Sequence, residues 1–269
     1  MNSTHKGYRF PVIGTLETCF PEKNGTPRQS GIASASRARL RIDAAELNNP
    51  EYSLRDLSSF SHVWILFVFH LDGQAKACNQ GRSVVVKSKV APPRLGGAKV
   101  GLFATRSPHR PSPIGLSLVR ILEVEGESVL LEGGDFVDGT PVLDMKPYLP
   151  AFDAPSAEGE TAASVFVPDW ASPTAVKEGD LTVMLTARAK LQLERCFAGA
   201  RPKGALIQTQ ESMLRLVGEV LSGDPRSVYR RDKCSDRLYF VELDGLHFSV
   251  WFDEEDGQLF AEVLRVRQN

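Results

Sequence analysis

The stretch VWILFVFH, residues 63–70, is an unbroken run of aliphatic and aromatic side chains that ends in a histidine. A run of this length is far too short to span a bilayer, and its β-branched and aromatic residues favour a strand. Because no polar residue alternates with the apolar ones, the pattern predicts a central strand that is buried on both faces.

Other strand patterns lie on both sides of this run. Arg39 and Arg41 alternate with apolar neighbours, as in a half-buried strand, and residues 125–128 (EGES) form a hairpin signal between two apolar runs. Further strands are therefore expected at residues 8–20, 38–42, 116–124 and 129–131, and one short helix at residues 48–57. Strands joined by loops rich in Gly and Pro favour a β-barrel or a sandwich over alternating βαβ units.

The second half of the chain has a different pattern. Residues 151–180 are rich in Ala, Ser, Pro and acidic residues, which is typical of a linker or a long surface loop. Beyond it, strands are expected at residues 181–186, 238–243, 246–252 and 259–266, and helices at residues 187–197 and 207–221. The chain is thus expected to hold a mainly β domain at residues 1–150 and a small α+β domain at residues 181–269.

Composition excludes several classes of protein. A net charge of −1 argues against a surface coated with positive charge, although it allows a local basic patch. The four cysteines are far apart and form no CxxC pair, so neither a disulfide framework nor a structural zinc site is expected. The five histidines lack metal-ligand spacing, and no metal is expected. Without an apolar leader or a membrane-length run, a soluble cytoplasmic protein is expected.

Common catalytic templates are absent, but several loops carry unusual groups. There is no GxxxxGK[ST], GxSxG or HExxH, and no strand is followed by GxGxxG. Instead, TPRQ (26–29), PPRLGG (92–97), GLFATRSPHRPSPIGLS (101–117) and DFVDGTPVLDMKPY (135–148) fall within one strand-rich region. Each loop alone fits turns with surface ion pairs. Their recurrence favours a binding site on a rigid scaffold, which His70 and His109 could also line.

The series TPRQ, FSHVWILFVFH, PPRLGG, GLFATRSPHRPSPIGLS and DFVDGTPVLDMKPYLP, in this order over about residues 8–150, closely resembles the TrmO family (TsaA-like proteins) of tRNA adenine-N6 methyltransferases. The later GDPRSVY (223–229) resembles the C-terminal domain of that family more loosely. Ala91 before the Pro pair and Ser112 in the RSPHRPSPIG loop depart from common bacterial members. These departures bear on the details of substrate contact.

The resemblance implies a β-barrel that uses S-adenosyl-L-methionine to methylate N6 of N6-threonylcarbamoyladenosine at position 37, beside the tRNA anticodon. It also implies a homodimer. The cofactor contacts that it implies are Gln29, Ser30, Gly31, His70, Leu71, Arg106, Leu116, Gly133, Gly134 and Asp135. A methyltransferase on a barrel agrees with the many strand patterns and with the missing dinucleotide-binding motif.

The acceptor nitrogen would be a poor nucleophile, because its lone pair is delocalised into the purine and the carbamoyl group. A carboxylate that removes or orients its proton would help. Asp138 is the preferred candidate because it adjoins the Gly139–Pro141 turn, and Asp144 is the second. In the competing interpretation both aspartates only bond to backbone N–H groups of turns. Lys146 and Tyr148 would either contact substrate or brace the loop.

The anticodon stem-loop of a tRNA needs cations for its phosphates, and the threonyl carboxylate suits a bidentate arginine. Arg94, Arg106, Arg110 and Arg28 are candidates in the N-terminal domain. Prolines in the RSPHRPSP loop would hold Arg106 toward the cofactor and Arg110 toward the RNA. In the C-terminal domain the candidates are Arg226, Tyr229 and Arg230, where a solvated turn is the alternative.

Two other functions remain open at this point. One is a non-catalytic RNA-binding or regulatory barrel that keeps the loops without the activity. The other is a methyltransferase whose acceptor is a different RNA or a small molecule. Gln29, Arg106, Asp135 and Asp138 favour an enzyme, and a basic patch in the C-terminal domain would argue against a small-molecule acceptor.

Overall fold

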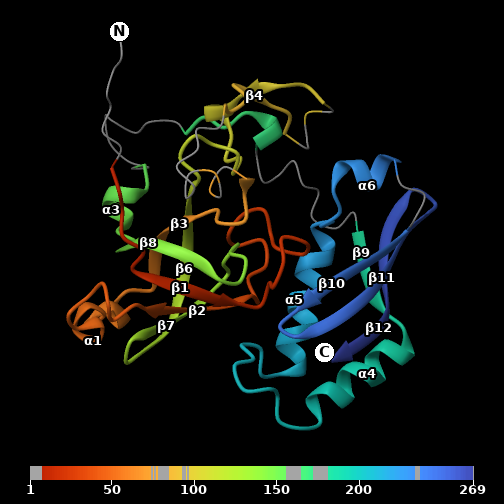
Figure 1. Ribbon diagram of the computed structural model, residues 1–269. Helices are drawn as coiled ribbons and strands as arrows, with labels where there is room; N and C mark the ends of the chain where they lie inside the picture. The colour runs from red at the N-terminus through yellow and green to blue at the C-terminus, as the bar shows by residue number, and fades with distance from the viewer. Residues whose placement is uncertain are drawn as a thin grey trace.

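The computed structural model describes residues 8–73, 75, 77, 85–92, 95, 97–155, 165–171, 181–233 and 237–268. Its N-terminal half is a closed antiparallel barrel of six strands in the order β1-β2-β7-β6-β3-β8. The strands are β1 (Gly14–Thr18), β2 (Arg37–Ile42), β3 (His62–Val68), β6 (Ile114–Glu125), β7 (Ser128–Glu132) and β8 (Thr140–Pro147). The barrel expected from the motif series is confirmed (Figure 1).

Strand β3 is central, between β6 and β8, but it is not buried on both faces. Val63, Ile65 and Phe67 are fully buried in the barrel core, whereas Trp64, Leu66 and Val68 on the outer face are only half-buried. The expectation of two buried faces was therefore wrong for a single chain. Inside the barrel, a Cβ added at Gly115 would lie 2.2 Å from the Phe67 ring, so only glycine leaves room for that ring.

The short helix expected at residues 48–57 is broken in two. It forms α1 (Pro50–Ser53), where the Asn49 side chain accepts a hydrogen bond from the Tyr52 N–H at 3.1 Å, and the 3-10 turn η1 (Leu57–Ser59). Asp56 between them has a φ of +64°, a left-handed conformation that no helix interior contains. The sequence pattern correctly predicted helical turns in this segment, but it predicted one helix where the structure has two short elements.

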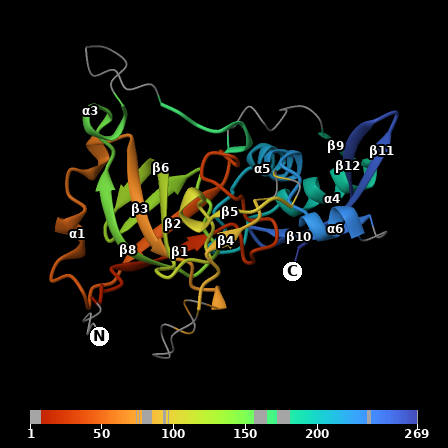
Figure 2. The same ribbon diagram turned by 90° about the horizontal axis from the view of Figure 1, so that it is seen from above.

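The C-terminal half is an α+β unit, as expected. Its sheet has the order β10-β11-β12-β9, with β9 parallel to β12. The elements are β9 (Leu181–Leu185), α4 (Ala187–Phe197), α5 (Gln210–Ser222), α6 (Val228–Lys233), β10 (Leu238–Leu243), β11 (Leu246–Glu255) and β12 (Gln258–Gln268). Figure 2 shows α5 on the side of this sheet that faces the barrel. None of the helices in the described residues is long and apolar enough to cross a membrane.

Short elements lie along the chain between β3 and β6 and between β8 and β9. They are β4 (Lys89–Val90), paired with β5 (Val100–Gly101), the 3-10 turn η3 (Leu102–Ala104), α3 (Pro150–Asp153) and the 3-10 turn η4 (Asp169–Ala171). Of the expected linker at residues 151–180, residues 156–164 and 172–180 lie outside the described part of the chain.

The two halves share a core through the loop of residues 19–36, which joins β1 to β2. Cys19, Phe20, Ala33 and Ala35 are buried in the apolar cluster of the C-terminal unit rather than in the barrel. The C-terminal unit also donates to this loop, from Asp244 N–H to the Cys19 carbonyl at 2.8 Å. Burial raises the pKa of the Cys19 thiol to about 12, so this cysteine is a packing residue and no nucleophile.

Candidate active site

One rim of the barrel collects most of the predicted cofactor contacts. In an antiparallel barrel the C-terminal ends of β1, β3 and β7 meet the N-terminal ends of β2, β6 and β8 at the same rim. The 19–36 loop, the residues after β3 and β7, and the residues before β6 and β8 therefore converge there. We call this end the site rim.

Two hydrogen bonds join the loops at the site rim. Arg106 donates from Nη1 to Oε1 of Gln29 at 2.7 Å, although 77 residues separate them. Gly31 N–H donates to the Gly133 carbonyl at 2.8 Å. Both glycines have left-handed φ values, +83° and +81°, which residues with a Cβ adopt only under strain. The structure thus brings Gln29 to Arg106 and Gly31 to Gly133 at the site rim.

Asp135 is a largely buried carboxyl group at this rim. Its Oδ1 accepts a hydrogen bond from Ser117 Oγ at 2.5 Å, and Ser117 itself is only 3% exposed. Burial raises the pKa of Asp135, while the Ser117 hydroxyl, the Arg106 guanidinium and the Ser30 N–H act in the opposite direction. The motif series contained Ser117, but its role depends on a contact that the sequence alone does not show.

The remaining predicted cofactor contacts are spread over this rim. The Nε2 atom of His70 lies 4.0 Å from the position that a Cβ on Gly139 would take, so the ring faces the turn before β8. Leu71 is 38% exposed. Leu116 is 55% exposed and projects from the outer face of β6, because its neighbour Ser117 points inward. Its side chain is therefore not on the same face as the Asp135 carboxyl.

The two aspartates predicted to act on the acceptor have different surroundings. Asp138 is exposed at the site rim, and its Oδ1 accepts a hydrogen bond from the Thr18 N–H at 2.8 Å. Asp144 lies in the middle of β8, paired in register with Leu66, and its carboxylate contacts Nζ of Lys146 at 2.8 Å. Asp138 therefore does accept a backbone N–H, from β1 rather than from its own turn, and Asp144 belongs to the outer barrel wall.

Comparisons with known proteins match this architecture. The model of the tRNA-methyltransferase O N-terminal domain matches residues 15–154. A tRNA (adenine(37)-N6)-methyltransferase of Escherichia coli is 37% identical over 94% of this chain and 97% of its own length. The chain belongs to the tRNA-methyltransferase O family. The resemblance inferred from the loop motifs is thereby confirmed.

Two further relatives come from Pseudomonas aeruginosa. One is named as a candidate S-adenosylmethionine-dependent methyltransferase and is 44% identical over 86% of this chain and 87% of its own length. The other is a crystal structure of TrmO, with a TM-score of 0.66 and 27% identity over 97% of this chain and 100% of that chain. The fold of this family therefore extends over both the barrel and the C-terminal unit.

The cations predicted to contact RNA differ in how they are held in this family member. Arg28 is exposed and donates from Nη2 to the Arg226 carbonyl at 3.3 Å. Arg110 donates from Nη1 to the Thr105 carbonyl at 2.7 Å, and its guanidinium lies 5.5 Å from the centre of the Phe103 ring. Arg110 is thus folded back on its own loop. Arg94 lies outside the described residues.

The C-terminal basic cluster is largely internal. The Arg226 guanidinium makes two bonds to the Asp224 carboxylate, at 2.8 and 2.9 Å, and lies 4.0 Å from the centre of the Phe252 ring. Arg230 donates to the Leu238 carbonyl at 2.6 Å. Tyr229, by contrast, is 71% exposed. The sequence did not reveal Asp224, whose left-handed φ of +42° places its carboxylate beside Arg226.

Lys146 and Tyr148 are away from the site rim. They lie at the far end of β8, where Lys146 pairs in register with Trp64 and the Tyr148 ring packs edge-on against Trp64, with 6.0 Å between ring centres. Thr140 at the other end of β8 is the residue next to the site rim. These contacts favour the bracing role for Tyr148.

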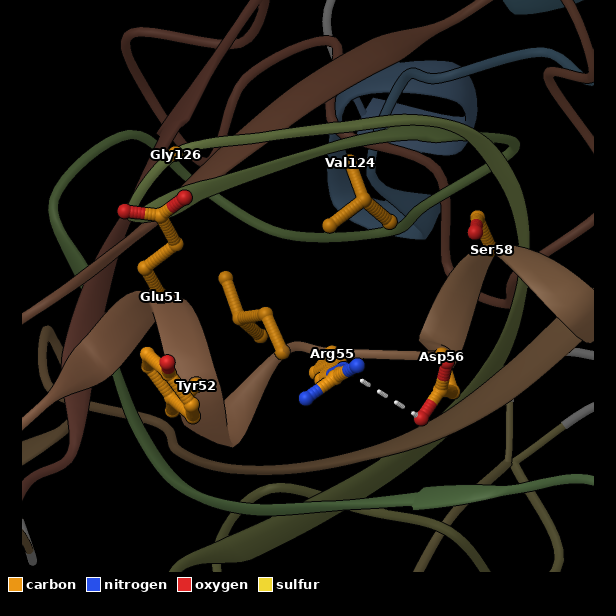
Figure 3. Close-up of a pocket in the computed structure, with 8 residues that line it drawn as sticks. Glu51, Tyr52, Arg55, Asp56, Ser58, Val124 and Gly126 are labelled. Carbon is orange, nitrogen blue, oxygen red and sulfur yellow. Dashed lines mark ion pairs between the residues drawn. The ribbon is translucent and has the colours of Figure 1, made fainter.

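A hollow of about 450 Å³ lies at this far end as well, between α1 and the β6–β7 hairpin (Figure 3). It contains none of the predicted site residues; Arg55 and Asp56 in its wall form an exposed ion pair at 4.0 Å. Within the part of the chain that the structure describes, no three His, Cys, Asp or Glu side chains gather closely enough to hold a metal ion.

Proposed function

We propose that the protein transfers a methyl group from S-adenosyl-L-methionine to N6 of N6-threonylcarbamoyladenosine at position 37 of tRNA. The observation that carries this proposal is the convergence of Gln29, Arg106 and Asp135 at one rim of a family-typical barrel, beside the turn that bears Asp138. The names of the Escherichia coli and Pseudomonas aeruginosa relatives support an adenine-37 acceptor and this methyl donor, respectively.

The groups at the site rim fit such a donor. Bound S-adenosylmethionine would supply a methyl group on a positively charged sulfur. A half-buried carboxylate such as Asp135 stabilises a nearby positive charge or accepts hydrogen bonds from hydroxyl and amino groups. Gln29 and the backbone around Gly31 and Gly133 supply further polar contacts, and partly exposed Leu71 supplies apolar surface.

Asp138 is proposed to act on the acceptor nitrogen. Because Thr18 N–H holds Oδ1, the carboxylate has a fixed direction, and Oδ2 has no hydrogen bond within the described part of the chain. That oxygen can accept the N6 proton or orient the N6 lone pair toward the methyl group, which would help a weak nucleophile. Asp144 remains the second candidate, but its contact with Lys146 on the barrel wall favours Asp138.

The tRNA anticodon stem-loop is proposed to lie across the site rim. Arg106 and Arg28 are exposed there and suit phosphates or the threonyl carboxylate, which a guanidinium can bind with two hydrogen bonds. In the C-terminal unit, exposed Tyr229 suits stacking on an unpaired base. The protein would work in the cytoplasm, where its tRNA substrate is used.

A homodimer is part of this proposal. The outer faces of β3 and β6 present Trp64, Leu66, Leu116 and Leu118, which are half-buried or exposed in a single chain. These strands are hydrogen-bonded neighbours, so their apolar side chains form one continuous face. A second copy that covers this face would explain why the outward-facing residues of β3 are apolar as well as the inward-facing ones.

The function is tested with purified protein, S-adenosylmethionine and two tRNA preparations, one with and one without threonylcarbamoyl on adenosine 37. Mass spectrometry of the nucleosides should detect methyl transfer only to the threonylcarbamoylated tRNA. Equal methylation of both tRNAs would contradict the proposed acceptor. Binding of tRNA without any methyl transfer would favour a non-catalytic RNA-binding barrel.

The Asp138→Asn variant tests the proposed base. Asparagine keeps an oxygen that can accept from Thr18 N–H, so if Asp138 only holds this backbone bond, the kcat of methyl transfer stays near wild type. Loss of a general base should lower kcat by about 10²- to 10⁴-fold while cofactor affinity stays within about twofold. Asp144→Asn is compared in parallel, and a larger loss in that variant would reverse the order of the two candidates.

A further inference from the structure

Asp72 follows β3 and is buried, with 4% of its surface exposed. Its Oδ1 accepts a hydrogen bond from Nζ of Lys23 at 2.8 Å, and the same ammonium donates to the Leu71 carbonyl at 3.1 Å. Its Oδ2 is also buried and has no hydrogen-bond partner among the residues that the structure describes. The Nδ1 atom of His109 lies 3.7 Å from that oxygen. Neither the cofactor contacts nor the proposed base uses this carboxylate.

The three residues come from three different segments of the site rim. Lys23 belongs to the 19–36 loop, which also carries Gln29 and Gly31. Asp72 follows His70 at the end of β3, and its N–H closes a turn onto the Phe69 carbonyl at 3.0 Å. His109 belongs to the loop of residues 102–113 before β6, which also carries Arg106. One buried carboxylate therefore lies between all three segments.

The unpaired oxygen of Asp72 favours a movement of His109 toward it. A buried carboxylate oxygen without a partner is unfavourable, because it has lost water and gained no donor. An N–H···O hydrogen bond spans about 2.9 Å, so the His109 ring at 3.7 Å is less than about 1 Å too far away. His109 is 66% exposed and can move with its loop toward Oδ2.

We propose that Asp72 is a positioning residue that fixes the Gln29-bearing and Arg106-bearing loops onto the end of β3 through Lys23 and His109. The His109 bond to Oδ2 closes when ligand lies between these loops. This inference rests on the proposed function, because the loops are those expected to bind the methyl donor. The Lys23 bond holds the 19–36 loop before binding and so lowers the ordering cost, while the His109 bond forms only in the bound state and adds to its stability. Both effects fall on cofactor affinity and KM rather than on kcat.

The test measures S-adenosylmethionine affinity by calorimetry, together with KM and kcat, for Asp72→Asn, Lys23→Met and His109→Phe. Asp72→Asn should weaken binding about three- to tenfold with kcat changed less than about twofold. In each double variant, the losses of binding free energy should be non-additive. Lys23→Arg keeps the donor, so its affinity should stay near that of wild type. Lys23 and His109 are exposed, so their variants stay informative if Asp72→Asn folds poorly.

Asp56→Asn is the matched control, since Asp56 is exposed at the opposite rim and Asn tolerates its left-handed backbone. Additive effects, or a fall in kcat at unchanged KM, would overturn the proposal. If wild type neither binds the donor nor methylates tRNA, the proposed function itself fails. Hydrogen exchange of the free protein then decides the positioning role of the Lys23–Asp72 contact: faster exchange in residues 19–36 of Asp72→Asn supports it, and unchanged exchange there rejects it.

Discussion

At the scale of single residues, Asp135 is expected to contact the cofactor, and its buried charge lowers the stability of the fold. Burial raises its pKa, so the folded protein binds this proton more readily than the unfolded chain does. The free energy of unfolding therefore falls as pH rises from the ordinary value of 3.8 through the raised value, and the loss is complete above it. Strain or charge that lowers stability is a common property of binding sites.

The variant Asp135→Asn should consequently melt at a higher temperature than wild type at neutral pH. Its amide oxygen can still accept from Ser117, while the buried charge is gone. The difference in melting temperature should shrink as pH falls toward 3.8, and cofactor affinity should drop. Melting curves over a pH series measure this, with the exposed turn residue in Asp256→Asn as control. A melting difference that does not depend on pH would contradict the role of the buried charge.

At the scale of elements, local patterns predicted the boundaries of helix α4 because its determinants are local. The helix was expected at residues 187–197, and Thr186 caps it by accepting from the Ala189 N–H at 3.1 Å. The prediction of one continuous helix at residues 48–57 was wrong because Asp56 adopts a left-handed conformation, which helix propensity does not indicate. The contact between Ser117 and Asp135, and that between Lys23 and Asp72, depend on loop closure across the barrel, which periodicity cannot show.

Helix α5 provides a second contact of this long-range kind. The Glu219 carboxylate accepts from the Ala35 N–H and from the Ser34 hydroxyl, each at 2.7 Å, across more than 180 residues. Arg215 on the same helix supports the carboxylate at 2.9 Å. The C-terminal unit thereby holds the end of the 19–36 loop, which carries Gln29 and Gly31.

We expect Glu219→Gln to lower the free energy of unfolding by about 1–3 kcal/mol. The amide keeps one acceptor but turns its NH₂ group toward a backbone N–H or a hydroxyl, so at least one strong bond is lost. Cofactor affinity should fall as well, because the loop is less firmly held. Urea titration and calorimetry measure the two effects, with exposed Glu194→Gln on α4 as control. An unchanged free energy of unfolding would mean that the bonds from Ser34 and Ala35 to Glu219 do not stabilise the contact between the 19–36 loop and α5.

At the scale of the whole molecule, the barrel and the C-terminal unit cannot be treated as independent. Phe20 and Ala35 belong to the N-terminal sequence but pack in the C-terminal core, and Asn24 accepts from the Tyr239 hydroxyl at 2.6 Å. The sequence predicted both folds correctly, but it assigned residues 19–36 wholly to the first domain. A loop that packs on a neighbouring unit has no signature in local hydrophobic periodicity.

The outer face of β3 and β6 is apolar and partly exposed in a single chain. The run VWILFVFH predicted burial on both faces, and a single chain provides only one buried face. Because Leu66 and Leu116 are partners in register, a second copy placed over them would bury a continuous apolar patch. Wild type should therefore be a dimer by light scattering at micromolar concentration, and Leu118→Asp should shift it to monomer, since a buried unpaired carboxylate is unfavourable. Leu191→Asp, at an exposed leucine on α4, should remain dimeric. A monomeric wild type, or a dimer that persists in Leu118→Asp, would reject this face as the interface.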